Sequence, residues 1–266
     1  MTNKPLILAI KGDARQSHAV RALRGYFDTV ETQFPLSGTA AADILLLPML
    51  TKNGSFDGIS KHLKPSALVL GGRIPKELKE RFLSMGYEVE DYYDSPSLKL
   101  KNALPTAEGT LMLAMENTPR VINGSRVLVT GFGACGRQIA RLFALLGAKV
   151  CIAARSPAAR AEAEALGLLA VGLDNVIAVA ALSDIIVNTV PAPVFGRAEL
   201  AASKDTALFI EIASYPYGID EGAALNLGRR LIKAPALPAL YAPETGGEYI
   251  AQAVRDIIVR RMGVTP

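Results

Sequence analysis

The sequence predicts an α/β protein with two doubly wound parallel sheets. Short apolar runs alternate with amphipathic helical patterns in the amino-terminal part, at residues 6–10, 44–47 and 67–70, with weaker runs at 29–34 and 87–93. Such alternation is typical of parallel strands that are connected by helices. A second alternating series follows a loop and a helix and contains a glycine-rich turn. We therefore expect a flavodoxin-like first domain and a Rossmann-type second domain.

The second series opens with the strand pattern RVLVT at 126–130, followed by Gly131-x-Gly133-x-x-Gly136 and an amphipathic helix. In a dinucleotide-binding turn the first glycine makes the bend, the second admits a pyrophosphate, and the third lets the helix pack on the strand. The helix start then offers N–H groups to phosphate. Further strand patterns follow at 149–154, 182–195, 206–214 and 229–237. The whole context predicts dinucleotide binding, with a purely structural turn as the alternative.

The domain boundaries follow from these series. We expect a substrate domain over residues 1–118 and a dinucleotide-binding domain over 119–241, with the segment 242–266 packing back on the first domain. A helix from about 106 to 117 and a last helix from 245 to about 261 should bridge the two domains, with a cleft between them.

The residues after the second strand of the glycine series indicate which cofactor binds. NAD sites usually have a carboxylate there, which accepts hydrogen bonds from the ribose hydroxyls. This chain has Arg155 and Ser156, with Arg160 one helical turn further on. A guanidinium suits a 2′-phosphate, so NADP(H) is expected; a solvated loop arginine is the alternative. The predicted cofactor-binding residues are Gly131, Phe132, Gly133, Ala134, Cys135, Gly136, Arg137, Arg155, Ser156, Asn188, Thr189, Val190, Pro191, Ala213 and Ser214.

Composition narrows the function classes. The chain has 266 residues, half of them hydrophobic, and a net charge of +4 with scattered basic residues, so neither nucleic acid nor a membrane is an expected partner. The mild positive charge suits an acidic small molecule. The start of the sequence does not resemble a secretory signal, and the two cysteines, Cys135 and Cys151, do not suggest a disulfide, so we expect a cytoplasmic protein. The two histidines, His18 and His62, have no metal-ligand spacing, so no metal site is expected.

Candidate catalytic and substrate-anchoring residues lie where strands of the predicted sheets end. Arg15, beside Asp13 and Gln16, follows the first strand, and Arg73 follows the fourth; either arginine can hold a carboxylate through two hydrogen bonds. A surface ion pair is the alternative for each.

Helix starts supply further candidates. The expected helix start at Thr106, with Glu108, offers N–H groups to an anion, and Lys99, Lys101 and Asn102 lie on the loop before it. Thr245 and Glu244 belong to the start of the last helix, where Thr245 is expected to be a cap. Glu108 and Glu244 are the proton-acceptor candidates.

Several motifs together resemble one enzyme family, the A subunits of dipicolinate synthase. The motifs are GDARQ (12–16), PTAEGTLMLAMENT (105–118), GSRVLVTGFGACGRQIARL (124–142), AARS (153–156), DIIVNTVPAPV (184–194), IEIASYPYGID (210–220) and APALPALYAPETGGEYIAQAV (234–254). The resemblance is strongest from about residue 102 onward, and it is weak over 17–60.

The resemblance implies an NADP-dependent oxidation of a dihydrodipicolinate to pyridine-2,6-dicarboxylate during sporulation, in the mother-cell cytoplasm. It also implies that the partner is a flavoprotein-like B subunit, and we expect a homo-oligomer. Two alternatives stay open: another two-domain NADP-dependent dehydrogenase, similar to shikimate or alanine dehydrogenases, and a non-catalytic subunit that binds NADP(H). The absence of an obvious acid–base pair in the sequence supports the second alternative.

Overall fold

The computed structural model describes residues 4–34, 41–51, 56 and 58–264. The chain forms two compact units, one of residues 1–102 and 238–266 and the other of residues 103–237. The chain passes between them inside helix α3 (Pro96–Asn117) and at the start of α9 (Leu237–Tyr241). The first boundary therefore lies at residue 102 and not at the expected 118.

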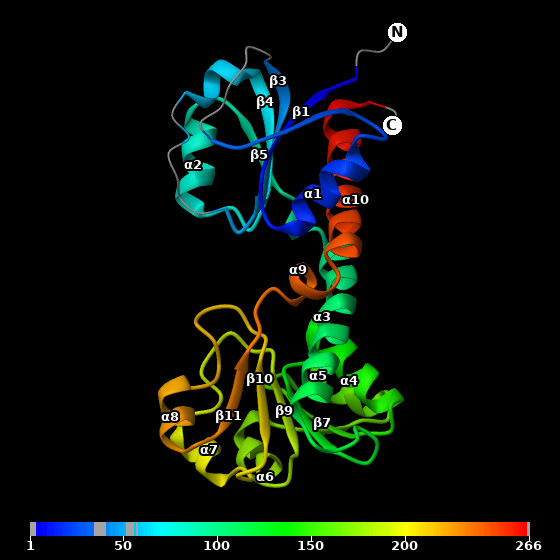
Figure 1. The fold of residues 1–266 in the computed structure, drawn as a ribbon, viewed down its shortest axis with the longest axis vertical. Coiled ribbons are helices and arrows are strands. Elements are labelled where there is room, and N and C mark those ends of the chain that lie inside the picture. Colours follow the sequence, from blue (N-terminus) through cyan, green and yellow to red (C-terminus); the bar gives the residue numbers. More distant parts are fainter. Residues whose placement is uncertain (1–3, 35–40, 52–55, 57, 265–266) are drawn as a thin grey trace. The chain divides into compact units, whose positions relative to one another are not determined.

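The first unit contains a parallel sheet in the order β2-β1-β3-β4-β5, which is the flavodoxin-like order that the sequence predicts (Figure 1). The strands are β1 (Leu6–Ile10), β2 (Asp28–Thr32), β3 (Ala42–Met49), β4 (Leu63–Gly72) and β5 (Glu88–Asp91). The helices are α1 (Ala14–Leu23), α2 (Lys76–Ser84) and α10 (Pro243–Met262), with the short 3₁₀ helices η1 (Ile59–His62) and η2 (Tyr92–Asp94). The first turns of α3 and nearly all of α9 also belong to this unit.

Both faces of this sheet are buried, because successive strand residues point to opposite sides. Ile44 and Leu46 pack with α1 and α10 on one face, whereas Leu45 and Leu47 pack with α2 on the other. Figure 1 shows α1 and α10 side by side. Gly247 lets these helices approach closely, since a Cβ there would lie 2.5 Å from the Cβ of His18.

The second unit contains a six-stranded parallel sheet in the order β11-β10-β9-β6-β7-β8, which is the Rossmann order. The strands are β6 (Arg126–Thr130), β7 (Lys149–Ala153), β8 (Leu169–Val171), β9 (Ile185–Asn188), β10 (Leu208–Glu211) and β11 (Arg230–Lys233). The helices after α3 are α4 (Ala134–Leu145), α5 (Pro157–Ala165), α6 (Val176–Ala180), α7 (Arg197–Ala202) and α8 (Glu221–Asn226), with the 3₁₀ helix η3 (Leu173–Asn175). Among the strands of this unit, all of which the structure describes, only the short β8 was not expected from the sequence.

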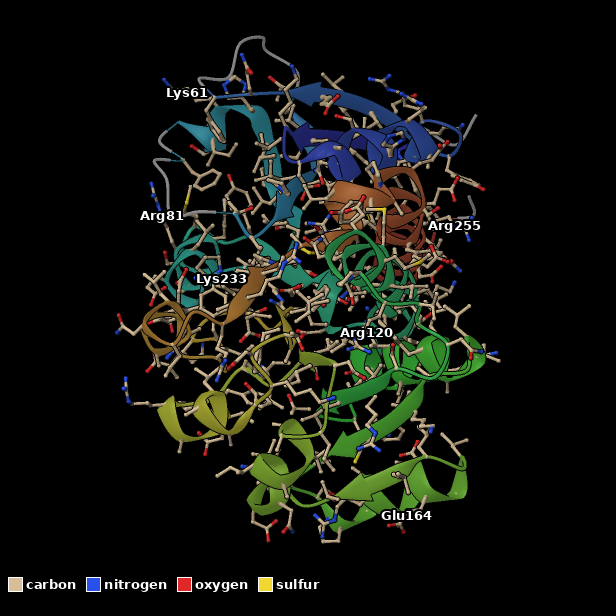
Figure 2. All side chains as sticks on the ribbon, turned by 60° about the horizontal axis from the view of Figure 1, so that its bottom comes forward. Lys61, Arg81, Arg120, Glu164, Lys233 and Arg255 are labelled. Atoms are coloured by element: carbon tan, nitrogen blue, oxygen red, sulfur yellow. The ribbon has the colours of Figure 1, made fainter. Side chains whose placement is uncertain are left out.

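Many charged side chains lie on the outside of each unit, although a few polar and charged ones are buried. Lys61 and Glu164, for example, are exposed and project from the ribbon in Figure 2. No helix among the described residues is both long and apolar enough to cross a membrane.

Helix α3 corrects the expected loop over 95–105. The helix begins at Pro96, and the Ser95 hydroxyl caps it by accepting a hydrogen bond from the Leu98 N–H at 3.3 Å. A serine cap followed by proline at the first helical position is a standard helix start. The sequence pattern instead favours Pro105 as a boundary, but α3 continues through it. Proline only removes one N–H donor and strains one turn, and a long helix with buried contacts tolerates that.

Candidate functional site

The glycine turn of the second unit is shaped for a ligand that lies against backbone. Gly131 has φ +85°, in the region that favours glycine, and a Cβ at Gly136 would lie 2.2 Å from the Gly131 carbonyl oxygen. These two glycines are therefore required by the fold itself. Gly133 differs, because it is exposed and a Cβ there meets no protein atom within 4 Å. If glycine is required at 133, the reason is a ligand, as expected for the second glycine of a dinucleotide turn.

Helix α4 begins directly after this turn. Gly133 is its N-cap, and no side chain caps the helix. The N–H groups of the first turn of a helix lack intrahelical acceptors, and the helix dipole places partial positive charge there. The turn and the helix start together fit a pyrophosphate.

A network of buried polar side chains connects the ends of three neighbouring strands. The Thr130 hydroxyl, at the end of β6, lies 2.5 Å from Asn188 Oδ1 at the end of β9. Asn188 Nδ2 donates to Glu211 Oε1 at 2.8 Å, at the end of β10. The Thr189 hydroxyl donates to the Thr130 carbonyl at 2.7 Å. The network holds the carboxyl ends of the strands, where ligands of such sheets bind.

Glu211 is the centre of this network and was not among the residues predicted from the sequence. Its side chain is 1% exposed, and its carboxylate accepts hydrogen bonds from the N–H groups of Ala213, Gly218 and Ile219 at 3.0, 2.8 and 2.9 Å. A buried carboxylate is tolerated when donors surround it in this way. Glu211 thereby shapes the loop over 212–219. The available signal was an acidic residue at the end of the apolar strand LFIE.

The residues after β7 occupy the position expected for a ribose contact. Arg155 and Ser156 are exposed there. Ser156 is the N-cap of α5, its hydroxyl accepting from the Ala159 N–H at 3.4 Å. Arg160 is held to backbone, donating to the carbonyls of Ala154 and Arg155 at 2.8 and 2.9 Å. Arg155 is therefore the arginine of this segment whose guanidinium is best placed to meet a ligand.

Arg137 lies in the first turns of α4. Its Nη2 is 2.5 Å from Glu162 Oε2, and its guanidinium lies over the Phe132 ring with 5.5 Å to the centroid. The Phe132 side chain is buried, at 6% exposure, so it is the backbone of this residue that borders the turn. This pairing fixes the Arg137 side chain beside the glycine turn.

In the first unit, the buried Arg15 forms an ion pair with the partly exposed Asp13. Its guanidinium is 3% exposed and lies 2.5 Å from the Asp13 carboxylate through Nη2, with Nε at 3.1 Å. Asp13 is also the N-cap of α1, accepting from the Arg15 N–H at 3.0 Å. The Nη1 atom of Arg15 lies 3.5 Å from the sulfur of Met49. The Nε side of the guanidinium is thus occupied, and the Nη1 side faces a weak acceptor.

Comparison with known proteins identifies the chain's relatives. Residues 106–214 match the family model of the D-isomer specific 2-hydroxyacid dehydrogenase, NAD binding domain. The A subunit of dipicolinate synthase from Bacillus subtilis is 35% identical over 166 residues, which cover 62% of this chain and 56% of that protein. The aligned part thus spans little more than half of that relative's length.

Two solved structures agree with this chain over nearly its whole length. The crystal structure of the dipicolinate synthase A subunit from Bacillus halodurans has a TM-score of 0.88 at 25% identity, covering 97% of this chain and 99% of that chain. The crystal structure of the same subunit from Bacillus subtilis also has a TM-score of 0.88, at 26% identity, covering 99% and 98%. The chain is thus similar in sequence and in fold to A subunits of dipicolinate synthase. Its second unit contains the nicotinamide dinucleotide-binding domain of an oxidoreductase.

The second unit revises the expected roles of Thr106 and Glu108 and shows what holds Asn188. Asn188 is 0% exposed, and its side chain is held by hydrogen bonds with Thr130 and Glu211, so it has a structural role at the ends of these strands. Thr106 and Glu108 lie inside α3 and form no helix start; the Thr106 carbonyl accepts from the Thr110 hydroxyl at 2.8 Å, and Glu108 is exposed. The remaining residues, Thr189, Val190, Pro191, Ala213 and Ser214, do follow β9 and β10 as expected.

The first unit also revises several predictions. Lys99, Lys101 and Asn102 belong to α3 and not to a loop, and Lys101 Nζ donates to Gln252 Oε1 at 2.5 Å. Helix α10 begins at Pro243, so Thr245 is its third residue and no side chain caps the helix. Arg73 does follow β4, with φ +53° and its guanidinium 4.7 Å from the centroid of the Tyr93 ring. Thr245 is therefore not a cap, and Arg73 stays a candidate anchor.

Proposed function

We propose that the chain uses NADP⁺ to oxidise a dihydrodipicolinate to pyridine-2,6-dicarboxylate, as the A subunit of a dipicolinate synthase. The observation that supports this most strongly is the agreement over nearly the full length with two structures of dipicolinate synthase A subunits. The substrate would lose a hydride to the nicotinamide ring and a proton to solvent or a base. The product ring is aromatic, so much of the driving force lies in the substrate, and the protein mainly has to position the reacting atoms.

The chain's own residues contribute binding and orientation. The Gly131–Gly136 turn and the start of α4 would hold the pyrophosphate of the cofactor, which supplies the hydride acceptor. Arg155 would pair with a 2′-phosphate, and this is the basis of the proposed preference for NADP(H). The Thr130–Asn188–Glu211 network would hold the loops after β9 and β10 against the nicotinamide half.

The biological setting is part of the same proposal. Partnership with the B subunit, a role in sporulation, the mother-cell cytoplasm and self-association into a homo-oligomer are proposed from the similarity to dipicolinate synthase A subunits.

The test is a turnover assay with the purified full-length chain. Dihydrodipicolinate is generated in place by its biosynthetic enzyme, NADP⁺ is added with or without the B subunit, and the absorbances of NADPH and of pyridine-2,6-dicarboxylate are followed. We expect both products in equal amounts. NADPH binding without product, even with the B subunit present, would instead support a non-catalytic NADP(H)-binding subunit. The exposed position of Glu108 is the observation that favours that alternative.

A further inference from the structure

Two buried polar side chains of the first unit have no protein partner among the residues that the structure describes. Gln16 is 2% exposed, and both its Nε2 and its Oε1 lack a hydrogen bond. Tyr92 is 0% exposed, and its hydroxyl also lacks a partner. Burying an amide and a hydroxyl in this state is destabilising, because each group loses its hydrogen bonds to water. Such groups are rare in native proteins unless a ligand or water completes them.

Both side chains lie at the carboxyl edge of the parallel sheet, where ligands of flavodoxin-like folds bind. Gln16 follows β1 closely, and a Cβ at Gly12 would lie 3.1 Å from its Cβ. Tyr92 follows β5, and a Cβ at Gly72 would lie 2.8 Å from its hydroxyl oxygen. Because Gly12 and Gly72 have no Cβ, the side chains of Gln16 and Tyr92 have room beside them. The switch point of the strand order lies between the adjacent β1 and β3.

Arg15 and Met49 lie near Tyr92, because the charge of Arg15 acts on the Tyr92 hydroxyl and Nη1 of Arg15 reaches Met49. Asp13 occupies the Nε side of the Arg15 guanidinium, and Nη1 lies 3.5 Å from the sulfur of Met49. A thioether is a weak acceptor for a guanidinium, and methionine is flexible. Met49 is the register partner of Gly72, against which the Tyr92 ring packs. A stronger acceptor in the place of the Met49 sulfur would therefore satisfy the Nη1 donors of Arg15.

The electrostatics of the cluster favour an anion. Gly246, in the first turn of α10, is so close to Arg15 that a Cβ there would lie 3.0 Å from the arginine Cδ. The start of this long helix carries no side-chain cap, so its partial positive charge adds to that of Arg15. Burial raises the pKa of Tyr92, so its hydroxyl stays protonated and can donate to a carboxylate.

We propose that Gln16, Tyr92 and the Nη1 side of Arg15 form a buried recognition site for one carboxylate of a planar diacid, and that Met49 fills this position until the ligand enters. The identity of the diacid as pyridine-2,6-dicarboxylate rests on the proposed function. In this arrangement Tyr92 and Arg15 donate to the carboxylate, and the Gln16 amide donates through Nε2. These are specificity-determining contacts and require no proton transfer.

The test compares Gln16→Met and Tyr92→Phe, which keep size and remove only polar atoms, with Gln252→Met and Tyr87→Phe as matched controls. Binding of pyridine-2,6-dicarboxylate to the full-length chain with NADP⁺ bound is measured by calorimetry. We expect each of the first two variants to weaken diacid binding about tenfold or more, as for the loss of a hydrogen bond to a charged group. NADPH affinity and both control variants should stay within about twofold of the unaltered chain.

Thermal unfolding without ligand separates this role from a structural one. Removing an unpartnered buried polar group should leave Tm unchanged or raise it in Gln16→Met and Tyr92→Phe. Variants that bind the diacid normally would overturn the proposed site while leaving the proposed function intact if the unaltered chain turns over. If the unaltered chain shows no turnover but binds the diacid through Gln16 and Tyr92, the proposed function is overturned and the proposed site is not. An unaltered chain that binds no diacid would overturn the site.

Discussion

At the scale of single residues, the three glycines of the turn have different reasons to be glycine. Gly131 and Gly136 are needed by the protein's own packing, whereas the space around Gly133 is open. We therefore predict that Gly133→Val leaves the unfolding free energy within about 1 kcal/mol of the unaltered chain but weakens NADPH binding by about 100-fold or more. Chemical denaturation and fluorescence titration check this. As a contrast, Gly136→Ala should destabilise the unit, and an unaffected NADPH affinity in Gly133→Val would place the cofactor elsewhere.

Arg155 carries the prediction on cofactor choice. Its guanidinium is exposed after β7, where a 2′-phosphate would lie. Arg155→Asp should weaken NADPH binding about tenfold or more while changing NADH binding much less, because only NADPH carries the second phosphate. Titration with both nucleotides measures this ratio, and Arg197→Asp in the same unit is a control. An equal loss for both nucleotides would remove the assignment of Arg155 to the 2′-phosphate.

Glu211 is a buried carboxylate that depends on the hydrogen-bond donors around it. In Glu211→Gln, an amide NH₂ replaces an oxygen that now accepts from backbone N–H groups, so donors face donors. We predict a loss of about 2–3 kcal/mol in the free energy of unfolding. Urea denaturation checks this, with the exposed Glu164→Gln as control. A variant as stable as the unaltered chain would show that the network is not needed to hold the loop over 212–219.

At the scale of elements, the contact between α1 and α10 sets a limit on side-chain size. Alanine normally favours a helix over glycine by up to about 1 kcal/mol. At Gly247, however, a Cβ would lie 2.6 Å from the Arg15 carbonyl oxygen, and backbone cannot move aside cheaply. Gly247→Ala is therefore expected to destabilise the chain by about 1–3 kcal/mol, against its helix propensity. Thermal and urea unfolding decide the sign, and a gain in stability would contradict the close helix contact.

Helices α3 and α10 also show that local sequence patterns do not decide where a helix begins. Both start at a proline, at Pro96 and Pro243, and both starts were expected later in the sequence. Proline both begins and interrupts helices, so Pro96 and Pro105 compete as the start of α3. Burial of Ala103, Ala107 and Ala114 on either side of Pro105 decides the competition in favour of one long helix. The candidate anion site at Thr106 disappears with that decision.

At the scale of the whole molecule, each unit has one carboxylate that connects the start of a strand to a lysine. Asp43 accepts from Lys64 and the Leu6 N–H, and Asp184 accepts from Lys204 and the Arg126 N–H. Partial burial alone would raise the pKa of each carboxyl, but these hydrogen bonds and the lysine charges outweigh it and lower the pKa. Each carboxylate therefore stabilises its unit above the unfolded pKa of about 3.9.

This stabilisation should be lost as the pH falls from about 5 through the lowered pKa values. We expect Asp43→Asn and Asp184→Asn each to reduce the dependence of stability on pH between about 5 and 3, most clearly at low salt. Urea unfolding at a series of pH values measures this slope. Slopes identical to that of the unaltered chain would show that other carboxyl groups dominate the acid response.

The sequence by itself determined most of the strands and both sheet orders, although β8 and the starts of α3 and α10 were not expected. Apolar periodicity, the glycine turn and the family motifs are local properties, and they sufficed to predict both strand orders, the dinucleotide turn and the resemblance to dipicolinate synthase A subunits. Tertiary structure alone decided which polar side chains are buried and what they meet. The engagement of Asn188 by Glu211, and the enclosure of Gln16 and Tyr92 without partners, depend on residues distant in the chain. Burial and hydrogen bonding are properties of the packed surroundings, which a local pattern does not contain.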